Sequence, residues 1–208
     1  MQGVRITVLA TLLGFVLAAL LGLAAAILRR SRSAPLRHTV RFVLDFIRGT
    51  PLLVQLYFLF YILPGLGLTL SALTAGVLGI GLHYSAYMAE VYRAGIENVP
   101  RGQWEAAKAC NFATWQIWRY VVLPQAIGPM IPALANYLIA MFKETPLLSA
   151  ITVVELMGEA RSIANFNYRY LEPMTLVGAF FLAISLVAVA LVRLLERRFG
   201  QVGQPETA

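Results

Sequence analysis

The sequence predicts an all-α integral membrane protein with five transmembrane helices, and three observations support this. The chain of 208 residues is 59% hydrophobic and only 13% charged, whereas soluble domains are about 45–50% apolar and about 25% charged. Its apolar residues form runs long enough to cross a bilayer, and its basic residues stand at the edges of those runs. The formal charge of +7 therefore indicates membrane topology and not binding to nucleic acid.

The first span is expected at residues 6–28, which carry no charge. At about 1.5 Å per residue this run is long enough for a hydrocarbon layer of about 30 Å. A cleaved signal peptide is the alternative, but its apolar part is about 7–15 residues long and follows positive charge. Only Arg5 precedes this run, so a retained span is favoured.

The next uncharged stretch, residues 49–89, is too long for one crossing. Proline and glycine at 64–67 mark a turn that divides it. The whole chain, 1–208, is expected to form one transmembrane domain. Its remaining spans are expected at 50–63, 68–89, 125–142 and 174–192.

The basic residues predict the orientation. Segments 29–48, 93–119 and 193–198 hold 13 lysines and arginines, and the opposite side holds four. By the positive-inside rule, the N-terminus is expected outside, the C-terminus in the cytoplasm and the polar insertion 93–124 in the cytoplasm.

This insertion predicts a helix-turn-helix unit. Pro100 suits the first turn of a helix that continues to Lys108, and Asn111 can adopt the left-handed conformation that ends a helix. Apolar residues then recur at helical spacing over 115–122 until Pro124, where the helix is expected to stop. The core of the unit is expected to contain Trp104, Trp115 and Trp118.

The motif Glu105-Ala106-Ala107, followed by Asn111 and by Val121-Val122-Leu123-Pro124, resembles the Glu-Ala-Ala loop of ABC-importer permeases. The family usually has Gly at the position of Asn111 and often Ile at Val121. Residues 48–56 and 92–96 resemble the polar amino acid branch of that family. On this resemblance, the residues expected to contact the ATPase are Arg101, Gly102, Glu105, Ala106, Ala107, Asn111, Leu123 and Pro124.

The resemblance also implies the setting of the chain: a five-helix core in the bacterial cytoplasmic (inner) membrane. It implies a second permease subunit, identical or different, an ATPase dimer in the cytoplasm, a solute-binding protein outside and surrounding lipid. ATP would be bound by the ATPase, so no cofactor is expected in this chain. Independently, the sequence has no Gly-x-x-x-x-Gly-Lys-Ser/Thr phosphate loop.

Other functions were weighed against this interpretation. With two histidines and one cysteine, the chain offers no catalytic or metal-binding cluster, so an enzyme is not expected. A secondary carrier for a small polar solute is the alternative, but it would need a coupling-ion site and usually two inverted halves. For Glu105 the alternative is a solvated residue paired with Arg101, four positions earlier.

Gly49, Thr50 and Pro51 interrupt a helix that is expected to enter the membrane from the cytoplasmic side, and the resemblance favours placing them on the substrate path. Pro51 removes a hydrogen bond and disfavours helical geometry at Thr50. Backbone groups freed inside a bilayer must line a cavity or lie within protein, and transporters present such groups to solutes. The alternative is a plain helix start, with Thr50 as N-cap and Pro51 at the first position.

Lys143, Glu144 and Thr145 follow the fourth span directly and are also expected on the substrate path, because ionisable residues at this depth are costly. Snorkelling of Lys143 to the interface is the alternative. The related family motif usually has Asp, then Thr or Ser, then Ser. The version with Glu144 and Pro146 resembles permeases for ectoine-type compatible solutes. A polar amino acid or similar zwitterion is expected, its carboxylate at the Thr50 backbone and its amine at Glu144, while His83 and Tyr84 are expected to pack against helices.

Overall fold

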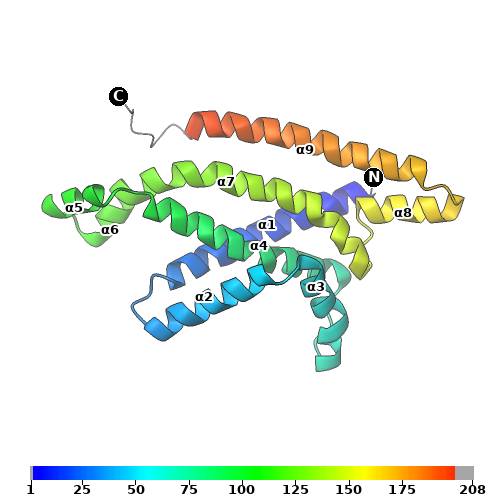
Figure 1. The fold of residues 1–208 in the computed structure, drawn as a ribbon, viewed down its shortest axis with the longest axis horizontal. Coiled ribbons are helices and arrows are strands. Elements are labelled where there is room, and N and C mark those ends of the chain that lie inside the picture. Colours follow the sequence, from blue (N-terminus) through cyan, green and yellow to red (C-terminus); the bar gives the residue numbers. More distant parts are fainter. Residues whose placement is uncertain (1, 200–208) are drawn as a thin grey trace.

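The computed structural model describes residues 2–199, with side chains described for residues 2–194, and these residues are helical with short connections (Figure 1). The α-helices in this part of the chain are α1 Gln2–Leu28, α2 Ala34–Gly49, α3 Leu52–Tyr57, α4 Ala72–Glu97, α5 Arg101–Ala109, α6 Thr114–Gln116, α7 Leu123–Glu144, α8 Leu156–Asn167 and α9 Leu171–Phe199. They are supplemented by π-helices at Phe58–Ile62 and Ile117–Val122 and by 3₁₀ helices at Leu63–Leu66 and Thr145–Ile151.

Helices α1 and α4 form the central pair of the molecule and share its most extensive contact. Glycines bring their backbones close together: a Cβ atom on Gly22 of α1 would lie 2.9 Å from the Ser85 carbonyl oxygen of α4. A Cβ on Gly81 of α4 would lie 2.6 Å from the Leu17 side chain of α1. Small residues permit this close packing where lipid offers no hydrophobic drive between helices. Helices α7 and α9 lie on one side of this pair, and α2 and α3 lie on the other (Figure 1).

Three helical segments are long and apolar enough to cross a membrane, at Gln2–Leu28, Thr114–Ile151 and Leu171–Leu194, and they contain the predicted first, fourth and fifth spans. A fourth is added if α2 and the segment Leu52–Leu66, which meet at a bend of 103°, count as one broken span. Helix α4 corresponds to the predicted third span, 68–89, but begins at Ala72, and it is long enough at 26 residues. It is not among the most apolar segments, because glycines and polar side chains such as His83 interrupt it.

The turn predicted at 64–67 is present: a 3₁₀ helix continues to Leu66, and the chain turns at Gly67, with a φ of 87°. One predicted helix end is wrong. Pro124 does not stop its helix, since the segment runs unbroken from Thr114 to Ile151. Pro124 stands in the first turn of α7, directly after the π-helix, where a residue without an N–H can be accommodated.

Where the sequence predicts a helix-turn-helix unit, the structure has α5, a turn and the three-residue α6. Asn111 has a φ of 61° and supplies the left-handed turn, as expected. Trp104 and Trp118 meet edge to face, with ring centroids 5.3 Å apart, against the buried side chains of this unit. Trp115 was expected in the same core but is 62% exposed, so that prediction is wrong.

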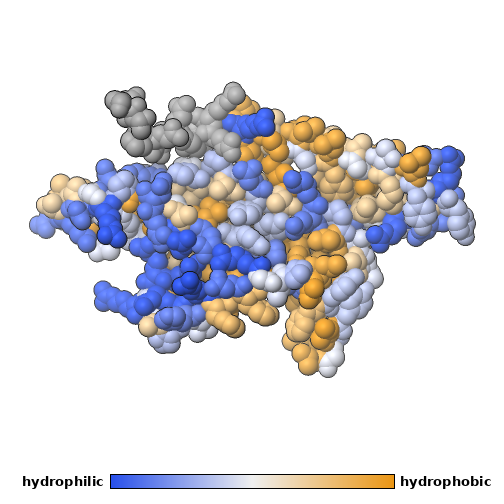
Figure 2. All heavy atoms as spheres, in the orientation of Figure 1, coloured by the Kyte–Doolittle hydropathy of each residue, from blue (hydrophilic) through white to orange (hydrophobic). Residues whose placement is uncertain are grey.

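The opposite end of the molecule is fastened by α8, which lies beside the start of α1 (Figure 1). Glu155 is fully buried and caps α8 by accepting hydrogen bonds from the N–H groups of Met157 and Gly158. The Leu156 N–H donates to the Thr7 hydroxyl of α1 at 3.1 Å. Polar surface gathers over α5, α6 and α2 and again at the α8–α9 turn, while apolar surface gathers around α3 and α9 (Figure 2).

Candidate functional site

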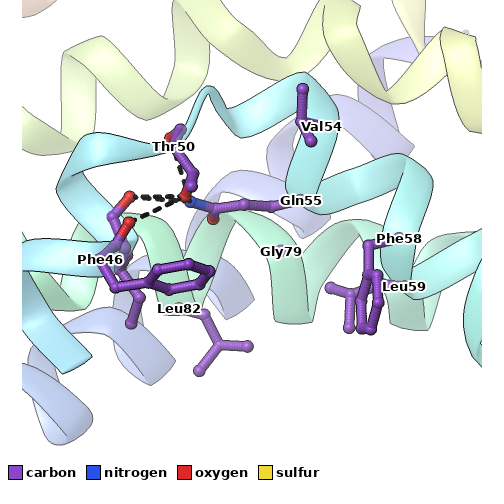
Figure 3. A pocket seen from close by; sticks show the side chains of 9 residues that line it. Phe46, Thr50, Val54, Gln55, Phe58, Leu59, Gly79 and Leu82 are labelled. Carbon is purple, nitrogen blue, oxygen red and sulfur yellow. Dashed lines mark hydrogen bonds between the residues drawn. The ribbon is translucent and has the colours of Figure 1, made fainter.

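The break between α2 and α3 is fixed by hydrogen bonds. Thr50 and Pro51 are both extended, and Thr50 ends α2 while Pro51 precedes α3, so Thr50 is not the N-cap of the alternative interpretation. The Gln55 side-chain amide, one turn into α3, donates to the Thr50 hydroxyl at 2.7 Å and to the Ile47 carbonyl at 2.8 Å (Figure 3). Sequence reasoning missed Gln55, although a polar residue one turn after a proline break was its available signal.

The backbone of Thr50 is also occupied. Its N–H donates to the Ile47 carbonyl at 3.4 Å, and its carbonyl accepts from Gln55 at 3.2 Å. These groups are thus less available to a solute than the sequence suggests.

A cavity of about 440 Å³ lies beside this break, between the α2–α3 junction, α4 and the end of α7. It brings together predicted residues that are more than 90 positions apart in the chain, Thr50 and Glu144. Its lining residues are Arg48, Gly49, Thr50, Pro51, Leu52, Leu53, His83, Tyr87, Glu144 and Leu147.

Two other predicted path residues do not line this cavity. Lys143 is exposed to the surroundings of α7, as the snorkelling alternative implies. Thr145 is fully buried, and its hydroxyl donates to the Phe142 carbonyl at 2.8 Å. The cavity also includes His83, which is buried against the rings of Tyr84 and Tyr87. Tyr84 packs in the core as expected, and its hydroxyl interacts with Glu144.

Two polar atoms of the cavity lining are buried without a hydrogen-bond partner in the described part of the chain: Oε2 of Glu144 and Nδ1 of His83. A buried polar group without a partner costs about 1–3 kcal/mol, and more when it is charged. The carboxyl group of Glu144 is not isolated as a whole, because it interacts with the Tyr84 hydroxyl of α4.

Arg48 and Glu144 are the charged members of the described lining, one of each sign. Arg48 forms ion pairs with Asp45 on its own helix and with Glu90 of α4, the latter at 3.4 Å. Glu90 also binds Arg29 at the end of α1 and, at 2.7 Å, Arg93. We call these four residues, Arg29, Arg48, Glu90 and Arg93, the Glu90 cluster. The sequence did not predict it, because contacts across 61 residues leave no local pattern.

A second cavity, of about 360 Å³, lies on the other side of the break (Figure 3). It is lined mainly by apolar side chains, among them Phe46, Val54, Phe58, Leu59 and Leu82. No charged residue lines it within the described chain, so it lacks the groups that would hold a zwitterion.

The predicted ATPase-contact residues form an exposed surface on α5, the turn and the start of α7, with one exception: Ala107 is buried. Glu105 is exposed, and in the described part of the chain it makes neither the expected ion pair with Arg101 nor any other. The alternative in which Arg101 neutralises Glu105 is therefore not what the structure has.

Residues 6–201 match the family described as binding-protein-dependent transport system inner membrane component. The chain belongs to this family. The permease is 41% identical to a probable amino-acid ABC transporter permease of Sinorhizobium fredii, over 99% of this chain and 89% of that one. It is 34% identical to the glutamine transport system permease of Escherichia coli, over 95% of this chain and 91% of that one.

Solved structures agree with this assignment. A crystal structure of an amino acid ABC transporter with histidines is 38% identical, covers 95% of the permease and 92% of that chain, and superposes with a TM-score of 0.90. The methionine transporter MetNI, in an inward-facing form, is only 19% identical, with a TM-score of 0.69, and supports the fold alone.

Family membership settles the functional class. The permease is the membrane subunit of an amino-acid ABC importer and is not an enzyme. The secondary-carrier alternative gains no support, and the relatives named above give none to an ectoine-type solute.

Proposed function

We propose that the permease binds its amino acid in the cavity at the α2–α3 break, with Glu144 holding the amine and Arg48 the carboxylate. The observation that carries this proposal is that Glu144 and Arg48, the charged residues of the described lining, stand in one cavity with opposite signs. One negative and one positive group complement a zwitterion. At about 440 Å³ the cavity lies within the range of about 300–1,000 Å³ typical of small-molecule sites.

Arg48 replaces the Thr50 backbone as the proposed carboxylate partner. The Thr50 N–H and carbonyl are engaged within the chain, whereas a guanidinium has five N–H donors and binds carboxylates in a bidentate manner. Gly49, Thr50 and Pro51 then shape the cavity wall, and the His83 side chain, which also lines the cavity, offers the solute a further polar contact.

We propose the following assembly. Five spans cross the inner membrane, with the N-terminus outside, and α5–α6 dock against a cytoplasmic ATPase dimer. A second permease subunit completes the pathway, and a solute-binding protein delivers the amino acid at the end of the molecule that carries α8. Motion of the ATPase would reach the cavity through α4, whose last turn leads directly into α5.

The test is uptake by the complete importer in proteoliposomes, using a mixture of radiolabelled L-amino acids supplied with the solute-binding protein. Glu144→Gln keeps the size of the side chain and removes its charge, so uptake should fall about tenfold, the effect of about 1.4 kcal/mol. Arg48→Gln should cause a similar loss. Lys143→Gln, at an exposed neighbouring site, is the matched control and should transport as the wild type does. Wild-type uptake by the Glu144→Gln importer would refute the site.

A further inference from the structure

We infer that Glu90 is a positioning residue that holds Arg48 at the wall of the solute cavity. This inference rests on the proposed function, since it concerns the arginine assigned there to the solute carboxylate. Glu90 does not itself line the cavity, so it would act through Arg48 and not by touching the solute.

Arg48 needs an external partner to be held in place. It stands in the last turn of α2, one residue before the chain leaves the helix, and its side chain is 31% exposed. Asp45, on the same helix, is its other ion-pair partner and is half exposed. In the described chain Glu90 is therefore the acidic residue that ties Arg48 to another helix. Two such pairs still leave N–H donors of the guanidinium for a carboxylate.

Glu90 is itself firmly placed. Its Oε1 atom binds Arg29, in the turn directly after α1, and its Oε2 atom binds Arg93 of α4, so both oxygens are fixed before Arg48 is considered. The side chains of Arg29 and Glu90 are only 19% and 24% exposed, which limits screening by water. Beneath the cluster, Leu44 of α2 packs on Ala86 and Ala89 of α4. A fixed carboxylate over a packed helix contact is a suitable anchor for a flexible arginine.

The contact between Glu90 and Arg48 joins α4 to the last turn of α2, directly before the chain bends by 103°. Without it, Arg48 would keep only the partly solvated Asp45 and would recover much of the rotamer freedom of a free side chain. The three arginines of the cluster would then also repel one another. Both effects would displace the guanidinium from the cavity wall.

The experiment is a double-mutant cycle on the importer in proteoliposomes, and the probe is the amino acid that the wild type takes up from a labelled mixture. Glu90→Gln should lower uptake about tenfold. Glu97→Gln is the matched control: Glu97 pairs with Arg93 at the exposed end of α4, and loss of an exposed pair should change uptake by less than about twofold. In the Arg48→Gln background, Glu90→Gln should cause no further loss, because it acts through Arg48.

Three results would overturn the inference. Wild-type uptake by Glu90→Gln would do so while leaving the cavity assignment intact, provided that Arg48→Gln is impaired. An equal fold loss from Glu90→Gln in both backgrounds would show that Glu90 acts independently of Arg48. Wild-type uptake by Arg48→Gln would refute the carboxylate assignment as well.

If Glu90→Gln does not assemble, Glu90→Asp decides the same question. Aspartate keeps the charge for Arg29 and Arg93 but is one methylene shorter, and the Arg48 contact, at 3.4 Å, is the longest in the cluster. The Asp variant should lose uptake as expected for Gln, and normal uptake would overturn the inference.

Discussion

At the scale of single residues, Glu105 is distinguished by its lack of partners. It lies on the exposed face of α5, and in the described part of the chain no cation neutralises it. An exposed, unpaired carboxylate costs the permease nothing in water, and it is available for a cationic group on another protein. This fits the proposed docking role better than a role in the stability of α5.

Charge reversal tests that role. Glu105→Lys should insert normally and should weaken association with the ATPase about tenfold, because a complementary charge is replaced by a repelling one. The measurement is the amount of ATPase that copurifies over a concentration series. Glu172→Lys, a reversal at the exposed start of α9, where Glu172 pairs with Arg169, is the control and should bind as the wild type does. Undiminished association of Glu105→Lys with the ATPase would show that Glu105 is a solvated residue without a role in docking.

The residues of the cavity differ in how far the sequence could reveal them. Thr50 and Glu144 are visible because each interrupts or ends an apolar run, which is a local signal. Arg48, His83 and Glu90 carry no such signal, since an arginine near a helix end and a histidine within a span have ordinary explanations. Their importance comes from contacts with residues far along the chain, and one sequence cannot show these.

At the scale of elements, the α2–α3 break is held in place by hydrogen bonds within the chain. Its polar groups are satisfied by Gln55, so the bend of 103° does not depend on a bound solute. The proline predicts that the helix is interrupted, but the direction of the bend follows from these hydrogen bonds.

Removal of the Gln55 hydrogen bonds should lower the free energy of unfolding. Gln55→Leu keeps the approximate volume but deprives the Thr50 hydroxyl and the Ile47 carbonyl of a donor, which should cost about 2 kcal/mol. Gln125→Leu is the control, because the Gln125 amide donates a single bond, to the Val121 carbonyl at 2.8 Å, and should cost about 1 kcal/mol. Thermal unfolding of the purified permease, followed by tryptophan fluorescence, measures both. Equal melting temperatures for the two variants would argue that the Gln55 hydrogen bonds do not hold the α2–α3 break in place.

Prolines also show where local rules fail at this scale. The break at Pro51 is predicted correctly, whereas Pro124 is passed without interruption because a π-helix precedes it. Both prolines lack an N–H group, so each leaves a backbone carbonyl without its helical hydrogen bond. Whether the helix continues depends on which neighbouring groups can donate to that carbonyl instead. Those neighbours are set by tertiary packing.

At the scale of the whole molecule, the two ends are built differently. One end carries α5 and α6, and the other carries α8 clamped to the start of α1 (Figure 1). If the basic residues orient the chain as the positive-inside rule predicts, these ends face opposite sides of the membrane.

Thiol labelling in intact cells tests this orientation. With Cys110 replaced, Asn98→Cys at the exposed end of α4 should resist a membrane-impermeant reagent, and Asn167→Cys at the exposed end of α8 should react. Lysis should make both reactive. The opposite pattern in intact cells would reverse the proposed topology.

Cys110 has a practical consequence of its own. It is the sole cysteine of the chain, it is exposed, and it stands next to the left-handed turn at Asn111. A thiol-reactive fluorophore can therefore be attached to the wild-type subunit at a single position, without engineering. The dye would lie beside the surface of α5 and α6 that is proposed to dock against the ATPase. Its emission would follow changes at this contact as ATP is turned over.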